Sequence, residues 1–194
     1  ISEFGSGTVV TGAQIVLQGE HTDSGSGGQN RVATVNESKT ALITIENTAI
    51  LSAIANGRMK AKILVSGVNT FTTVSGTANI KSSATVSVGG ALNATSDMSN
   101  VRGEFTDYEI CDLTELTTAS DQISITYSAS HTATAVAQST SGTTATVSLE
   151  CKFTEIKVVF EFGSVEVNVS VGEGGSILNK TANETIESGA SASY

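Results

Sequence analysis

The stretch TTATVSLECKFTEIKVVFEFGSVEVNVSV, residues 143–171, alternates apolar and polar side chains along most of its length. Alternation with a period of two residues is typical of a β-strand with one buried face. Gly163-Ser164 separates two such runs and has the form of a two-residue type II′ turn. The sequence therefore predicts a β-hairpin with a continuous apolar wall that begins where Phe162 faces Val165.

The other side of this predicted hairpin places Glu161 opposite Glu166. Like charges that face each other across a ladder destabilise it, so the pair needs an explanation. Solvent can screen an exposed pair, Lys157 on the same side can balance it, or a divalent cation can bridge the two carboxylates. The sequence leaves these three explanations open.

The composition of the whole chain favours an all-β fold. Of its 194 residues, 26 are serine, 27 are threonine and 19 are glycine, and none is proline. Threonine and valine suit strands, whereas glycine and serine supply turns. Many short strands separated by turn signals predict an antiparallel sandwich or barrel-like sheets. The strand-like runs are 8–20, 30–36, 41–46, 60–66, 69–75, 77–88, 122–128, 143–153, 154–162 and 165–171.

One segment departs from the strand pattern. Residues 47–57, NTAILSAIANG, begin with Asn47 at the position of an N-cap and end with Gly57 at the position that follows a helix. Ile50 and Ile54 would share one face. The sequence predicts a short helix near residues 48–56 that closes one end of the sheets.

The domain organisation is predicted from shifts in polarity. Residues 1–6, ISEFGS, read as the translation of two cloning sites and are interpreted as an expression scar. Residues 7–171 are predicted to form one β-rich domain, with a possible internal boundary at the loop-like segment 91–100. Residues 172–194 lack a second apolar face, so we expect a mobile or edge-pairing tail.

The charge of the chain bears on partners and location. Its net charge is −9 and no basic stripe is present, which disfavours nucleic acid. No apolar run approaches the roughly 18 residues of a membrane-spanning helix, so a membrane partner is not expected. An acidic surface rich in Ser and Thr favours a secreted, extracellular protein.

Two residues, Cys111 and Cys151, are the only cysteines. In a secreted protein they are predicted to form a disulfide, with two buried free thiols as the alternative. Simple alternation places Cys151 on the side of Glu155 and Lys157, away from the apolar wall, unless a bulge intervenes.

The segment 104–115, EFTDYEICDLTE, is dense in carboxylates. Calcium prefers oxygen ligands, often carboxylates, although no EF-hand-type loop is present. A solvated acidic face is the alternative interpretation. The candidate contacts with calcium or a mineral surface are Glu104, Asp107, Glu109, Glu161 and Glu166, and no other cofactor is expected.

Nothing in the sequence predicts catalysis. His21 and His131 are the only histidines, and neither has the spacing of metal ligands. No nucleophile elbow, zinc-protease motif or phosphate-binding loop occurs. We therefore expect a protein that is not an enzyme.

The segment 126–146, TYSASHTATAVAQSTSGTTAT, consists mainly of small and polar residues. A strand with two polar faces has a weakly specified register and can pair with other chains. It can equally be an ordinary solvated edge strand or hairpin. The hydroxyls predicted to contact hydrated surfaces are those of Thr132, Thr134, Ser139, Thr140, Ser141, Thr143 and Thr144.

The bias towards Ser, Thr, Gly, Ala and Val, with blocks such as AQSTSGTTATVS beside KFTEIKVVFEF, resembles the barnacle cement proteins of the 19-kilodalton class. The resemblance implies a secreted, non-catalytic component of an underwater adhesive, which adsorbs on surfaces and self-assembles through β-strands. The chain has only seven lysines, whereas that family is commonly lysine-rich. The alternatives are a surface filament or adhesin subunit of a microbe, and a β-pore-forming toxin of the aerolysin type.

Overall fold

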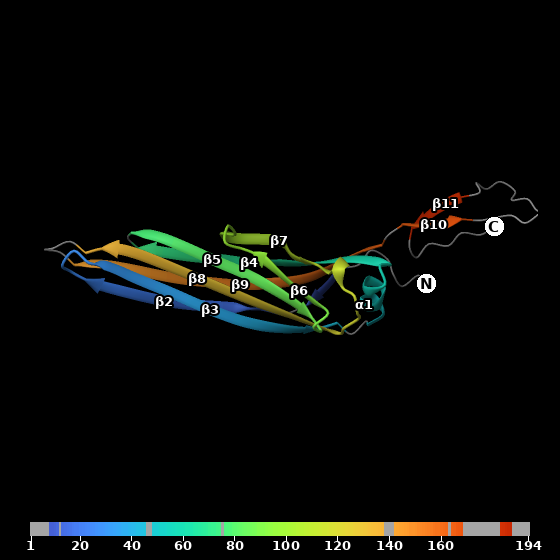
Figure 1. The fold of residues 1–194 in the computed structure, drawn as a ribbon, viewed down its shortest axis with the longest axis horizontal. Helices are drawn as coiled ribbons and strands as arrows, with labels where there is room; N and C mark the ends of the chain where they lie inside the picture. The colour runs from blue at the N-terminus through green and yellow to red at the C-terminus, as the bar shows by residue number, and fades with distance from the viewer. Residues whose placement is uncertain are drawn as a thin grey trace, which may run out of the picture.

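The computed structural model describes residues 8–11, 13–45, 48–74, 76–137, 142–162, 164–168 and 183–187. Two antiparallel sheets pack face to face, which confirms the predicted all-β sandwich (Figure 1). Sheet A contains β1 (Thr8–Thr11), β2 (Val16–Gly25), β9 (Thr143–Phe162), β4 (Met59–Val74) and β7 (Gly103–Asp112). Sheet B contains β3 (Asn30–Thr44), β8 (Gln122–Val136), β5 (Thr77–Val88) and β6 (Leu92–Asp97).

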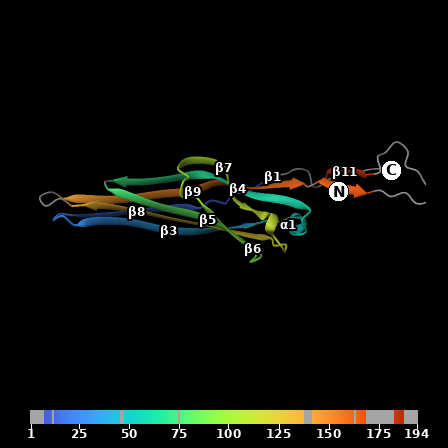
Figure 2. The same cartoon turned by 45° about the horizontal axis from the view of Figure 1, so that its top comes forward.

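The order of strands within each sheet sets the edges of the sandwich. In sheet A, β1 and β2 both pair with one side of β9, which is followed by β4 and β7. In sheet B the order is β3-β8-β5-β6, so β3 and β6 are the edge strands. Consecutive long strands such as β2 and β3, or β8 and β9, lie in different sheets and are seen running along each other in Figure 2.

The core fills the space between the two sheets and follows the predicted alternation. Ile123, Ile125 and Tyr127 of β8 are fully buried, and the Tyr127 ring stacks on that of Phe153 from β9 with 5.0 Å between centroids. Burial of such large apolar side chains is the main stabilising term of the fold.

A register shift in β9 reverses the predicted orientation of Cys151. Opposite β9, the register of β4 shifts between Ser66, which faces Glu155, and Gly67, which faces Phe153. Thr154 is therefore an extra residue, a β-bulge, that is not opposed by a residue of its own on β4. Before it the odd-numbered residues of β9 face the core, and after it the even-numbered residues do. Cys151 consequently points into the core on the same side as Phe160, and the prediction from simple alternation is wrong.

The short helix is confirmed as α1 (Thr48–Ala55). It ends in a Schellman motif, in which the Gly57 amide donates to the Ile54 carbonyl at 2.9 Å and the Arg58 amide donates to the Ala53 carbonyl at 2.8 Å. Gly57 has φ of 69°, the left-handed conformation that favours glycine at this position. The predicted N-cap at Asn47 lies outside the described residues.

The predicted hairpin at Gly163-Ser164 is wrong. β9 continues along β4, so that Glu161 faces Lys60. The following strand, β10 (Ser164–Asn168), pairs with β11 (Asn183–Glu187), where Glu166 faces Thr185. Glu161 and Glu166 therefore belong to different sheets, and the repulsion between them that the sequence suggested does not arise.

The segment 91–100, predicted to be a loop and a possible boundary, contains β6. Residues on both sides of it, such as Val65 and Phe153, belong to one hydrophobic core. Two further stretches of strand were not predicted. They are β7 and the middle of β3 at Glu37–Thr40. Of the predicted tail 172–194, the structure describes β11.

Gly67 generates a first testable prediction, because a side chain at this position would collide with the neighbouring strand. An added Cβ would lie 1.9 Å from the Lys152 carbonyl oxygen. Gly67→Ala should therefore lower the free energy of unfolding by about 3 kcal/mol, measured by chemical denaturation. Gly142→Ala is the control, since its Cβ would meet only an ordinary contact at 3.8 Å. Equal effects of the two substitutions would contradict this account.

Candidate functional site: the hydroxyl face of sheet B

The outward side of β8 consists of hydroxyl side chains at every second position. The residues are Ser124, Thr126, Ser128, Ser130, Thr132 and Thr134. Because β8 is bonded to β3 on one side and to β5 on the other, it is a central strand. The interpretation of this segment as an edge strand is therefore wrong, and so is the expectation of two polar faces, because Tyr127, Ala129 and Ala133 are buried on the other side. The hydroxyls of β8 belong to a wide face instead.

The neighbouring strands extend this pattern sideways into rows. In one row Thr40, Thr126, Thr85 and Thr95 lie side by side on β3, β8, β5 and β6. Neighbouring positions are separated by about 4.8 Å across the strands and about 6.7 Å along them. We call the outward side chains of four rows the hydroxyl face: Thr34, Asn36, Ser38 and Thr40 of β3; Thr126, Ser128, Ser130 and Thr132 of β8; Asn79, Lys81, Ser83 and Thr85 of β5; Thr95 and Asp97 of β6.

Hydrogen bonds between hydroxyls hold these side chains in place. Thr40 and Thr126 are linked at 2.7 Å between their Oγ1 atoms, and Ser38 and Ser128 at 3.0 Å between their Oγ atoms. Two further links join Thr34 to Thr132 at 3.2 Å and Thr85 to Thr95 at 3.0 Å. A hydroxyl can donate one hydrogen bond and accept two, so each linked group keeps capacity for an external partner.

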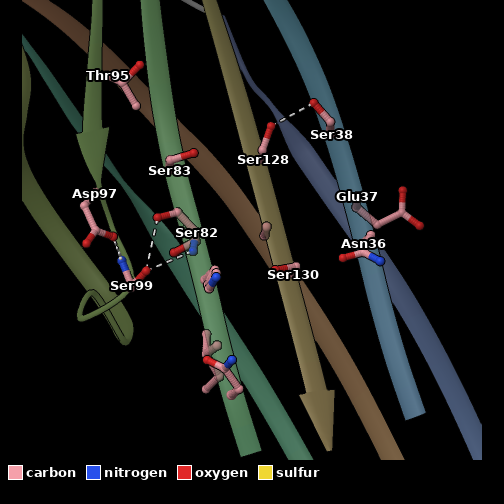
Figure 3. A pocket seen from close by; sticks show the side chains of 14 residues that line it. Asn36, Glu37, Ser38, Ser82, Ser83, Thr95, Asp97, Ser99, Ser128 and Ser130 are labelled. Atoms are coloured by element: carbon pink, nitrogen blue, oxygen red, sulfur yellow. Dashed lines mark hydrogen bonds between the residues drawn. The ribbon is translucent and has the colours of Figure 1, made fainter. Parts of the chain in front are cut away.

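The face is hollowed where it crosses the middle of the sheet. A hollow of about 890 Å³ lies over β3, β8, β5 and β6, as Figure 3 shows. At one side the Ser99 amide donates to Asp97 Oδ1 at 2.9 Å, and Ser99 Oγ donates to the Ser82 carbonyl at 3.4 Å. Hydrogen bonds from Ser99 lower the pKa of Asp97, so the carboxylate stays ionised, and Lys81 supplies the opposite charge.

The opposite surface of the sandwich, the outer face of sheet A, is chemically different because it carries ion pairs. Lys157 Nζ lies 2.9 Å from Asp107 Oδ1 and 3.3 Å from Glu155 Oε2, and Lys62 Nζ lies 3.3 Å from Glu109 Oε2. Hydrogen bonds to these carboxylates raise the pKa of both lysines. The two outer surfaces of the sandwich are therefore chemically distinct.

The predicted calcium contacts are not brought together. Asp107 and Glu109 are bound to lysines, Glu161 faces Lys60, and Glu104 faces Val68 at the start of β7. The side chain of Glu166 lies outside the described residues. Within the part of the chain that is described, no cluster of three or more His, Cys, Asp or Glu side chains could hold a metal ion. The acidic segment 104–115 forms β7 and the short 3-10 helix η1 (Leu113–Glu115).

Both cysteines are free and buried, so the predicted disulfide is wrong and its alternative is observed. Cys111 lies on β7 and faces Ile63 of β4, whereas Cys151 lies on β9, on the opposite edge of β4, and faces Asn69. Six residues of strand separate these positions by about 20 Å, far beyond disulfide reach. Burial is the main reason that the pKa of each thiol is raised to about 11, so neither is a reactive thiolate.

The residues predicted to contact surfaces are divided between two places. Thr132 and Thr134 point outward from β8, next to or within the hydroxyl face. Thr143 and Thr144 begin β9 and pair with β2 in sheet A, while Ser139, Thr140 and Ser141 lie outside the described residues. Sequence reasoning missed the contributions of β3, β5 and β6, because the partners of a central strand cannot be read from the strand itself.

The two histidines lie in different places, His131 in the core and His21 on β2. His131 is 1% exposed between the sheets, where its Nε2 lies 2.5 Å from Thr73 Oγ1 and its ring meets Phe71 edge-on at 5.8 Å between centroids. Desolvation lowers the pKa of His131. His21 lies on β2 and accepts a hydrogen bond from a backbone amide of β3.

His131 predicts a loss of stability in acid. Its folded pKa lies below the unfolded value of about 6.5, so the unfolded chain binds more protons as pH falls through that value. The melting temperature should therefore fall between pH 7.5 and 5, and the fall should be smaller in His131→Gln. Thr73→Ala, which keeps the buried imidazole, should retain the sensitivity of the wild type. Identical slopes in His131→Gln and wild type would refute this.

Comparison with protein-family models, with curated proteins and with solved structures found no match for this chain. Over the described residues, no helix has the length and apolar character needed to cross a membrane. The chemistry of the two sheet surfaces, above all that of the hydroxyl face, is therefore what bears on function.

Proposed function

We propose that the protein is a secreted attachment protein, without catalytic activity, that adsorbs through its hydroxyl face on extended, hydrated or mineral surfaces. The observation that carries this proposal is the unbroken series of outward hydroxyls on β8, in register with polar side chains on β3 and β5. The hollow at its centre is lined by three charged side chains of sheet B, Glu37, Lys81 and Asp97.

The weakness of each contact favours an extended surface over a small ligand. A hydrogen bond that replaces bonds to water contributes only about 1 kcal/mol. Many such bonds formed together can nevertheless hold a protein on a surface, because each further contact becomes intramolecular. The face carries no aromatic side chain for stacking on a single sugar ring. Its regular rows match a surface that repeats.

The order of the hydroxyls also favours adsorption. Cross-strand bonds such as Thr34–Thr132 and Thr85–Thr95 fix the side chains before any partner arrives, and threonine has few rotamers in a strand. Less conformational entropy is then lost on binding. A polar strand in a disordered chain would lack this advantage.

Cement proteins of the barnacle 19-kilodalton class and microbial surface adhesins are two settings for such a protein. Adsorption through the hydroxyl face would not use Asp107 and Glu109, which bind lysines on sheet A. A cation that bridges a mineral to other exposed carboxylates would be an additional contact.

An aerolysin-type pore is the less favoured alternative. Such a pore would turn the apolar sides of β8 and β9 towards lipid. On β8 this side carries His131 between Ala129 and Ala133, which is a poor lipid-facing surface. Release of dye from lipid vesicles by the purified protein would overturn the attachment proposal in favour of the pore.

Adsorption on hydroxylated silica or cellulose films, followed by quartz-crystal microbalance, tests the proposal. The double variant Thr126→Val and Thr132→Val removes two hydroxyls while keeping shape and strand propensity. It should weaken adsorption by about tenfold or more, at about 1 kcal/mol per hydroxyl.

Thr70→Val with Thr72→Val is the matched control, because both are exposed on β4 in sheet A. This control should adsorb as the wild type does. If the two double variants bind equally well, the hydroxyl face is not the attachment surface. Melting temperatures of both variants check that the sandwich is intact.

A further inference from the structure

One half of the free edge of β3 is masked by side chains of β2. The Val32 amide donates to Asp23 Oδ2 at 2.9 Å, and the Thr34 amide donates to His21 Nδ1 at 2.8 Å. β2 approaches closely here, since a Cβ at Gly19 would lie 2.4 Å from Val35 Cγ1. These contacts satisfy backbone groups that the edge of a sheet normally exposes.

The next part of the same edge is open. Asn36–Thr40 are all exposed. Their even-numbered amides point away from β8, because they share the orientation of Val32 and Thr34. Among the described residues, no group accepts a hydrogen bond from the amides of Asn36, Ser38 or Thr40. A row of unpaired backbone groups is a template for another strand.

Two of the other edges, at β7 and β6, are protected. β7 has two register shifts against β4 and carries the carboxylates of Glu104, Asp107 and Glu109. β6 extends only from Leu92 to Asp97. Register shifts, charges and short edge strands all hinder strand addition. Among the edges at β3, β6 and β7, the open part of β3 is therefore the strongest candidate for pairing with another chain.

Two charges on this edge select one register. Glu37 and Lys39 are exposed, and neither forms an ion pair with another described residue. Figure 3 shows Glu37 projecting from β3 on the side away from β8. These opposite charges lie two residues apart, with Ser38 between them. If the strand met its own copy in antiparallel orientation with Ser38 at the centre, each glutamate would face a lysine.

We propose that β3 pairs with β3 of a second copy of this chain, about a twofold axis at Ser38. Glu37 then faces Lys39 of the second copy, and Lys39 faces its Glu37, which is a stabilising cross-strand arrangement. Other registers bring like charges together or leave both charges unpaired.

The backbone orientation agrees with this register. Ser38 would face Ser38 of the second copy, and Asn36 would face its Thr40, so that the outward amides and carbonyls bond across the axis. The next pair would use Thr34, whose amide already donates to His21. The ladder therefore ends there, and the contact is short and reversible.

The dimer would join two copies of sheet B edge to edge. Directly opposed residues in an antiparallel ladder lie on the same side of the sheet, so both hydroxyl faces would point in one direction. The expected gain in adsorption rests on the proposed function, whereas the dimer itself does not.

Analytical ultracentrifugation of charge variants tests the pairing. Glu37→Lys and Lys39→Glu each place like charges opposite each other and should raise the dimer dissociation constant at least tenfold. An equimolar mixture of these two variants should form a heterodimer, and the double variant Glu37→Lys with Lys39→Glu should recover the wild-type constant. Glu150→Lys, an exposed change on sheet A, is the control and should leave the constant unchanged.

Hydrogen exchange gives an independent readout. The amides of Asn36, Ser38 and Thr40 should exchange more slowly at dimer-forming concentrations, and Ser38→Pro should abolish the dimer. A wild-type protein that stays monomeric at about 1 mM, or charge variants that dimerise equally, would overturn the proposal. Because adsorption of a monomeric variant is still measured separately on silica, failure of the dimer is distinguishable from failure of the proposed function.

Discussion

Sheet B depends on the position of β8 between two bonded neighbours. Its backbone groups form hydrogen bonds with β3 on one side and β5 on the other. Only its side chains are therefore left to contact the core on one face and solvent on the other. Alternation gives the core Ile123, Ile125 and Tyr127 and gives the solvent a series of hydroxyls. A shift of one residue would bury the hydroxyls and expose the apolar set. The same constraint that fixes the fold therefore also fixes the candidate attachment surface.

The size of the core side chains determines which part of the β3 edge is free. Towards the end of the sandwich where β2 is connected to β3, β8 contributes Ala133 and Ala135, and β9 contributes Ala145. Small residues let packed sheets approach each other, and here His21 and Asp23 of β2 reach the backbone of β3. Towards α1, large rings such as Tyr127 and Phe153 fill the space instead. At Glu37–Lys39 the contact with β2 is made by the Glu37 side chain, which lies beside Gly19, and among the described residues no β2 side chain accepts from the backbone there.

Local patterns predicted what depends on one strand or one turn, and long-range pairing decided the rest. The alternation and the Gly57 signal were enough for the all-β class and for α1. The extra residue at Thr154 could not be predicted, because a bulge is defined by the opposing strand, and it placed Cys151 in the core. The pairing of Glu161 with Lys60 likewise depends on β4, about 100 residues away in the chain. Thr132 and Thr134, whose predicted contact with surfaces stays a prediction, point outward, but their neighbours on β3 and β5 required the register.

The two proposed interactions would reinforce each other through thermodynamic linkage. A protein held on a surface by its hydroxyl face is confined to a thin layer, where the local concentration of its partner is high. Because both faces of a β3–β3 dimer point the same way, a dimer can bind with both at once, whereas a dimer with opposed faces could not. Any factor by which dimerisation strengthens adsorption must then equal the factor by which adsorption strengthens dimerisation. A short edge with one complementary pair of charges is suited to this role, since it stays largely dissociated in dilute solution and associates where the surface has concentrated and aligned the chains.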